Sequence, residues 1–282
     1  MRLVAAPLLF LCVCHAMAQD SLHTADEYHW ANNFGAQKTL ATGAVAAITL
    51  TSMYDAYNTW WKGAQKPFTF YTESWFGSHL GLDKPGHFFG TYTLFKVYRN
   101  LLLWGGYSRS TSLWWAAGLA VWNGMQIEIG DGMSAYGFDY QDLIFDFSGV
   151  AYGMLQSEVP LLQNFNFKFS YWSKKGFTSP ANFTQDYDAM TIWLTVNVHN
   201  LLPTSMERYW PEWLQIALGY GVGDNETKRE GVIAIDLNLE AFKTENDNVR
   251  LTEKLLDLMH VPAPAVKFST RTEPKYYLFH LY

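Results

Sequence analysis

The sequence predicts an α+β fold: an N-terminal bundle of about four apolar helices, followed by an antiparallel β-sheet or partial barrel of about six strands. Two observations support this. Before Pro160 the apolar residues form long segments with helical spacing, and after Pro160 they alternate with polar residues along short segments. Because successive side chains of a strand point to opposite faces, the change of period marks a change from helices to strands. We expect a helical domain over residues 36–160 and an antiparallel β domain over residues 161–282.

The first 18 residues have the features of a signal peptide. Arg2 supplies a positive charge, the residues after it are apolar, and Ala16-Met17-Ala18 forms a small-x-small cleavage site. Cys12 and Cys14 offer a lipoprotein signal as the alternative, but bulky residues precede both. We expect cleavage after Ala18, a polar N-terminal arm over residues 19–35, and an exported chain without cysteine.

Composition narrows the classes of function. The formal net charge is −6 and basic runs are few, which argues against nucleic-acid binding. Aromatic residues make up 17% of the chain and include 12 tryptophans, as expected at a membrane–water interface, although a tryptophan-rich core is the alternative. We predict the periplasm or outer membrane of a Gram-negative bacterium, with the inner membrane as the alternative. The expected partners are a membrane or envelope lipid, or an envelope protein.

Four segments of the first domain predict helices. Residues 37–57 carry almost no charge and predict a helix that is either buried in the bundle or, by its length, borders on a membrane span. A second helix should begin near Asp83, acting as its N-cap, and end at Gly105-Gly106. Residues 110–129 and 140–159 predict the third and fourth helices, the fourth ended by Pro160.

Period-2 alternation predicts the strands, which cover residues 165–171, 192–198, 214–222, 233–239, 266–270 and 275–282. A short helix over residues 249–260 and a break at Pro262-Ala263-Pro264 precede the last two. A wall of an outer-membrane barrel shows the same alternation as a sheet with one face on helices, but single-chain barrels begin at about eight strands. We therefore expect a sheet packed on the bundle.

An acid–histidine pair stands at the start of the second helix. Asp83 and His87 are four residues apart and share one helical face, where the carboxylate can orient the imidazole and raise its basicity. The alternative is a helix cap at Asp83 and an ordinary core histidine at His87. The residue types therefore permit acid–base chemistry without requiring it.

The fourth helix carries a stripe of two acids and two glycines, at Asp142, Asp146, Gly149 and Gly153. Glycines on a stripe let another helix approach closely, so we expect both acids to face inward, with a solvated acidic face as the alternative. Buried acids require partners. The candidates are Lys84, His87 or a cation, with Glu128 and Asp131 just upstream.

These residues resemble a known family. Asp83-Lys84-x-x-His87-Phe88, Glu128-x-x-Asp131 and Asp142-x-x-x-Asp146-x-x-Gly149 resemble the YfiM-like predicted periplasmic proteins, a domain of unknown function, and more distantly the VanZ-like membrane proteins. The resemblance spans residues 36–160. It implies a cell-envelope location and helices that bring the Asp-Lys-His and Glu-Asp-Asp groups together, and it implies no established reaction.

Three functions are compatible with this sequence. We favour a non-catalytic envelope protein, structural or binding, whose buried cluster locks helix packing. One alternative is an enzyme acting on a lipid-linked or phosphorylated envelope substrate, with His87 as acid–base group, Asp83 orienting it and Lys84 holding an anionic group. The other is a divalent-cation site for calcium or magnesium, with the oxygen ligands Glu128, Asp131, Asp142 and Asp146.

Overall fold

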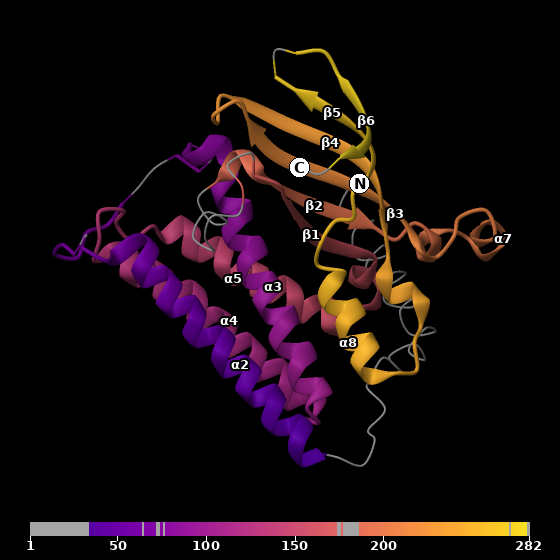
Figure 1. The fold of residues 1–282 in the computed structure, drawn as a ribbon, viewed down its shortest axis with the longest axis horizontal. Coiled ribbons are helices and arrows are strands. Elements are labelled where there is room, and N and C mark those ends of the chain that lie inside the picture. Colours follow the sequence, from indigo (N-terminus) through magenta and orange to yellow (C-terminus); the bar gives the residue numbers. More distant parts are fainter. Residues whose placement is uncertain are drawn as a thin grey trace, which may run out of the picture.

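The computed structural model describes residues 34–63, 65–71, 74–75, 77–173, 176, 186–270 and 272–280. Over these residues it has the predicted α+β fold, in which apolar helices come first and a six-stranded antiparallel sheet follows (Figure 1). The predicted signal peptide, residues 1–18, and residues 19–33 of the predicted arm lie outside the described part of the chain.

The four predicted helices are present. They are α2 (Phe34–Ala56), α3 (Asp83–Trp104), α4 (Arg109–Gly132) and α5 (Tyr140–Glu158). Ser108 caps α4 by accepting a hydrogen bond from the Thr111 amide, and Asp139 caps α5 by accepting one from the Gln141 amide. In the described ranges, no helix combines the length and apolar character that crossing a membrane requires.

The predicted N-cap of α3 is wrong. Leu82 occupies the cap position and makes no side-chain capping bond, whereas Asp83 lies in the first helical turn. The Asp83 carboxylate instead accepts hydrogen bonds from Lys84 and Tyr187, at 3.3 and 3.1 Å. Asp83 therefore does not cap the helix, and its carboxylate binds other side chains instead.

Helices α3 and α5 approach each other closely at the predicted glycine stripe. A Cβ atom at Gly149 would lie 2.2 Å from the backbone oxygen of Phe88, and one at Gly153 would lie 2.5 Å from the ring of Phe95. Both glycines are thus required by the contact between the helices. The bundle core beside this contact includes Val45, Phe95, Tyr98, Leu101, Leu102, Ala116, Ala117, Ala120 and Val150.

The sheet is an antiparallel meander in which each strand pairs with the one before it. Its strands are β1 (Phe165–Tyr171), β2 (Met190–Val196), β3 (Leu214–Gly223), β4 (Lys228–Leu237), β5 (Ala263–Ser269) and β6 (Lys275–His280). The free edge of β1 is covered by a short segment that follows helix α8 (Asp247–Leu256). There the Phe169 amide donates to the Leu258 carbonyl at 3.0 Å, and the His260 amide donates to the Phe169 carbonyl at 2.8 Å.

The predicted break at Pro262-Ala263-Pro264 is wrong, because β5 begins at Ala263. The pairing of β5 with β6 changes register between Ala263 and Ala265. Pro264 lies at this irregularity, where a residue without an amide hydrogen removes no regular ladder hydrogen bond. Pro264 can therefore stand in β5, just beyond the last pair of β5 with β4 at Ala265.

The sheet packs on the bundle through α3 (Figure 1). The Phe89 ring stacks on Phe169 with ring centroids 5.4 Å apart, and the Phe88 ring meets Phe167 edge-on at 4.7 Å. Leu82, which is 1% exposed, extends this contact into the core between α3 and the sheet. These contacts place the N-terminal turn of α3 against the sheet.

A buried ion-pair network joins β1, β4 and the end of α8. The Lys168 ammonium lies 2.9 Å from both Asp236 and Asp257, and it donates to the Leu237 carbonyl at 2.8 Å. Asp236 also lies 3.2 Å from the ring of His260. A fully buried lysine is stable here because its ammonium pairs with two carboxylates and donates to the Leu237 carbonyl.

Candidate functional site

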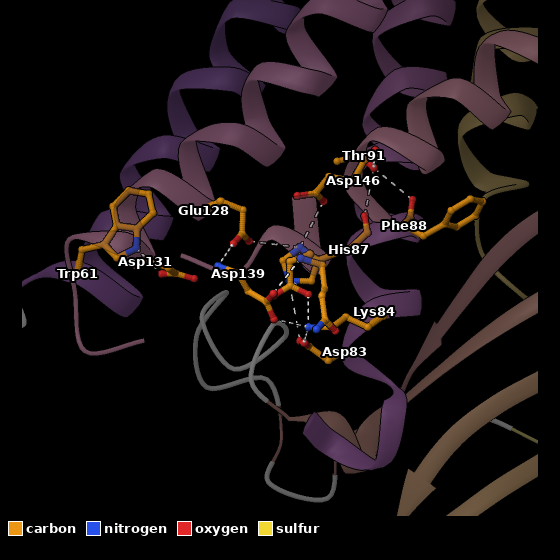
Figure 2. Close-up of polar contacts among 12 residues, drawn as sticks. Trp61, Asp83, Lys84, His87, Phe88, Thr91, Glu128, Asp131, Asp139 and Asp146 are labelled. Atoms are coloured by element: carbon orange, nitrogen blue, oxygen red, sulfur yellow. Dashed lines mark hydrogen bonds and ion pairs between the residues drawn. The ribbon is translucent and has the colours of Figure 1, made fainter. Parts of the chain in front are cut away.

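The ionisable cluster forms where three helix ends meet. Helices α3 and α5 begin at this end of the bundle and α4 ends there, so side chains from all three converge (Figure 2). The first turns of α3 supply a lysine, a histidine and an acid, and α4 and α5 supply four acids. The cluster comprises Asp83, Lys84, His87, Glu128, Asp139, Asp142 and Asp146.

The His87 imidazole is at the centre of the cluster. Its Nδ1 atom lies 3.3 Å from Asp146 Oδ1 and 3.8 Å from Glu128 Oε1. Its Nε2 atom lies 3.9 Å from Asp83 Oδ1 and 3.8 Å from Asp142 Oδ1. Burial alone would lower the pKa of His87, but the neighbouring carboxylates, Asp146 foremost, raise it well above its usual value.

Lys84 neutralises one side of the cluster. Its ammonium is 1% exposed and lies 2.5 Å from Asp142, 2.9 Å from Asp139 and 3.3 Å from Asp83. Burial would lower the pKa of Lys84, but the hydrogen bonds with Asp142 and Asp139 outweigh it and raise the pKa above its usual value. This lysine is therefore a permanent cation, already bound to carboxylates.

Glu128 and Asp146 face the other side of the imidazole and are almost completely buried, at 1% and 2% exposure. Glu128 Oε2 accepts a hydrogen bond from the Asp139 amide at 3.1 Å. Among the described residues, Glu128 Oε1 and Asp146 Oδ2 accept no hydrogen bond. Burial raises the pKa of Glu128 to about 8, so its carboxyl group retains a proton near neutral pH.

The pKa values of Asp83 and Asp142 are shifted in opposite directions although both residues border His87. Burial raises the pKa of Asp142 to about 6. For Asp83 burial acts in the same direction, but the charges of His87 and Lys84 outweigh it and lower the pKa below its usual value. Tyr187, just before β2, donates to Asp83 at 3.1 Å and so ties the cluster to the sheet.

Asp131, one of the predicted cation ligands, lies apart from the cluster. Its carboxylate accepts a hydrogen bond from the Trp61 indole at 2.7 Å, and Figure 2 shows it beside Trp61. Burial raises the pKa of Asp131 to about 6. Four of the five predicted acids thus surround His87 and the fifth does not.

Sequence reasoning missed two members of this site. Asp139 accepts from both Lys84 and the Gln141 amide, and its position just before an apolar helix could have indicated it as a helix cap. Tyr187 comes from a part of the chain more than a hundred residues after Asp83. No local sequence pattern connects the two.

Two sets of potential metal-ligand atoms share His87. One set joins it to Asp83 and Asp142, and the other joins it to Glu128 and Asp146; within each set the ligand atoms lie within 4.8 Å of one another. Lys84 already neutralises the first set. In the second set, buried carboxylate oxygens face a single imidazole, an arrangement that can hold a cation.

A family model described as "Predicted periplasmic lipoprotein (DUF2279)" matches residues 72–158. The matched segment holds α3, α4 and α5, and hence all seven cluster residues. The similarity agrees with the expected cell-envelope location. No curated protein and no solved structure matches the chain.

Proposed function

We propose that this protein is a non-catalytic, YfiM-like protein of the cell envelope whose helical bundle binds a divalent cation between His87, Glu128 and Asp146. The similarity of residues 72–158 to predicted periplasmic lipoproteins supports the location. The site rests on one observation: Glu128 Oε1 and Asp146 Oδ2 are buried beside the imidazole and accept no hydrogen bond from any described residue. Bound to a cation, these oxygens would no longer lack a partner.

The charge balance also favours a cation. Five carboxyl groups converge on two basic side chains, and Lys84 is held by the acids on its own side of His87. Among the described residues, Glu128 and Asp146 face the imidazole of His87 as their basic partner and do not share Lys84. A divalent ion would displace the proton of the Glu128 carboxyl group and the proton on Nδ1 of His87, and would bind both atoms.

The ligand types select the kind of cation. One imidazole nitrogen with two carboxylate oxygens suits zinc or manganese, whereas calcium and magnesium prefer oxygen ligands alone. The position of Asp131 beside Trp61 removes one of the four oxygen ligands expected for calcium or magnesium. We therefore propose zinc or manganese as the bound ion.

Thermal unfolding of the full chain tests this site. Zinc or manganese should raise the melting temperature, and at 100 times the dissociation constant the ion should add about 2.7 kcal/mol to the free energy of unfolding. Glu128→Gln keeps the shape of the protonated acid and should abolish the rise without lowering the ion-free melting temperature. Asp131→Asn is the matched control and should retain the full rise. Equal melting temperatures with each of these ions and with a chelator would refute the site.

A second candidate is an enzyme acting on a lipid-linked or phosphorylated envelope substrate. The side chains of His87, Asp83 and Asp142 are 19%, 14% and 13% exposed, so solvent reaches one side of the imidazole. Lys84 is poorly placed to hold an anionic group, because it is buried against three carboxylates. Phosphate release from a lipid phosphate by the wild type but not by His87→Gln would establish the enzyme over the non-catalytic site.

A further inference from the structure

The outward side of α4 carries no charge over most of its length. From Ser110 to Ile129 every exposed residue is uncharged. Trp114 and Trp115 are 64% and 62% exposed, and Trp122 continues the same side about two turns further along the helix. Exposed helix faces of proteins surrounded only by water normally carry charged or polar residues.

The two helices beside α4 have the same character. On α2 the exposed residues between Thr39 and Tyr54 are uncharged, and on α5 so are those between Tyr140 and Leu155. Large apolar side chains recur at helical spacing along each helix. We group them with those of α4 under the name apolar helix face: Leu40, Leu50, Tyr54, Trp114, Trp115, Trp122, Ile129, Ile144, Phe147 and Leu155.

Charged side chains border this face at one end of the helices. Lys38 stands at the start of α2, and Arg109 at the start of α4 pairs with Glu158 at the end of α5, with 3.0 Å between the nitrogen and oxygen atoms. Between these charges and the far end of α4, the uncharged stretch extends for roughly 30 Å, given a rise of 1.5 Å per residue. Helix α3 lies behind the face, toward the sheet (Figure 1).

We infer that the apolar helix face lies against a lipid bilayer, with α2, α4 and α5 in the plane of the membrane surface. Large apolar side chains exposed on all three helices are typical of surfaces that bind proteins or lipids. The absence of charge fits uncharged lipid chains, whereas a protein interface is about as polar as the remaining surface and carries about ten hydrogen bonds. Tryptophan and tyrosine at the exposed positions suit the membrane–water boundary.

Vesicle sedimentation with the full chain tests this inference. The wild type should bind vesicles of phosphatidylcholine alone and of phosphatidylcholine with phosphatidylglycerol, and added salt should not release it, because the face carries no charge. Trp115→Glu should lower the vesicle partition coefficient by about tenfold or more, since the indole loses its apolar contact and a charge enters. Leu50→Glu on α2 should act in the same direction.

Trp172→Glu provides the matched control, because Trp172 is also an exposed tryptophan, at 48%, but follows β1. It should bind vesicles as the wild type does, and circular dichroism should show all variants folded. Binding to neither vesicle, or binding that salt abolishes, would overturn the inference. So would a dimer in sedimentation velocity that Trp115→Glu converts into a monomer, because the face would then contact a second copy of the chain.

Discussion

A single buried lysine balances the charge at one side of the cluster. Lys84 is 1% exposed and contacts three carboxylates from two helices. Without its ammonium, the carboxylates of Asp83, Asp139 and Asp142 would face one another with His87 as the remaining basic side chain of the cluster. The site therefore depends on Lys84 for its stability even though we do not propose it as a ligand.

Lys84→Met should lower the free energy of unfolding by about 3–5 kcal/mol, because it leaves buried acids without their partner. Urea unfolding followed by circular dichroism measures the change. Lys38→Met removes an exposed lysine from α2 and should change stability by no more than about 0.5 kcal/mol. A loss of similar size in both variants would contradict the structural role of Lys84.

His280 gives the sheet a dependence on pH. Its ring is 1% exposed and meets Trp193 and Tyr277 edge-on. Burial, reinforced by the charges of Lys267 and His260, lowers the pKa of His280 to about 4. As the pH falls from 6.5 to 4, the unfolded chain binds a proton at this residue before the folded chain does, so the folded state loses stability.

Between pH 7 and pH 4, the wild type should therefore lose roughly 2–3 kcal/mol more of its free energy of unfolding than His280→Asn. Urea titrations of both proteins at pH 7, 5.5 and 4 measure this difference. Parallel losses in the two proteins would show that His280 does not contribute to the acid sensitivity.

The contact between α3 and α5 depends on the absence of side chains at two positions. A Cβ atom at Gly149 would lie 2.2 Å from the Phe88 carbonyl oxygen, so any larger residue must push the helices apart. The same contact brings Asp146 to His87, since Gly149 is less than one turn from Asp146 on α5. Helix packing and the geometry of the cluster are therefore coupled.

Gly149→Ala should lower the free energy of unfolding by about 1–3 kcal/mol and weaken the stabilisation by zinc or manganese. Gly90→Ala is the control on α3, because no atom lies within 4 Å of a Cβ built there. It should raise stability by up to about 1 kcal/mol, since alanine favours helix more than glycine does. Thermal unfolding with and without the ion measures both effects; a stabilising Gly149→Ala would contradict the close approach.

The helical and β halves share a core, which should make the whole molecule unfold as one unit. Phe169 of β1 is 5% exposed and stacks on Phe89 of α3. Phe169→Ala should lower the free energy of unfolding by about 3–5 kcal/mol. Circular dichroism of the helices and tryptophan fluorescence should then shift together, whereas two separate transitions would show that the halves unfold independently. Phe268→Ala, at a 45% exposed position, should have a much smaller effect.

Local periodicity predicted the main features of the fold and most of the candidate site. The change of period at Pro160 separates helices from strands, and the stripe with Gly149 predicted the inward position of Asp146. Both features depend on residues close in the chain, where side-chain direction follows from helix or strand geometry. The spacing of residues along the chain was therefore enough to predict the boundary at Pro160 and the inward position of Asp146.

Features that depend on tertiary packing were not predicted. Asp131 belongs to the same helix as Glu128, yet its partner is Trp61, which lies seventy residues earlier. Lys168 alternates like an exposed strand residue, but it is buried against acids from β4 and the end of α8. In both cases the deciding contact lies far along the chain, beyond the reach of periodicity.

The short segment that covers the edge of β1 sets an order of assembly for this sheet. Strands β1 to β4 can pair one after another as the chain is made from its N-terminal end, but the amide and carbonyl of Phe169 bond to residues 258 and 260. Until about ninety further residues have been made, β1 therefore presents an open edge to which another chain can add. Slow synthesis should then favour aggregation of incomplete chains, because the residues that cover β1 are made much later than β1 itself.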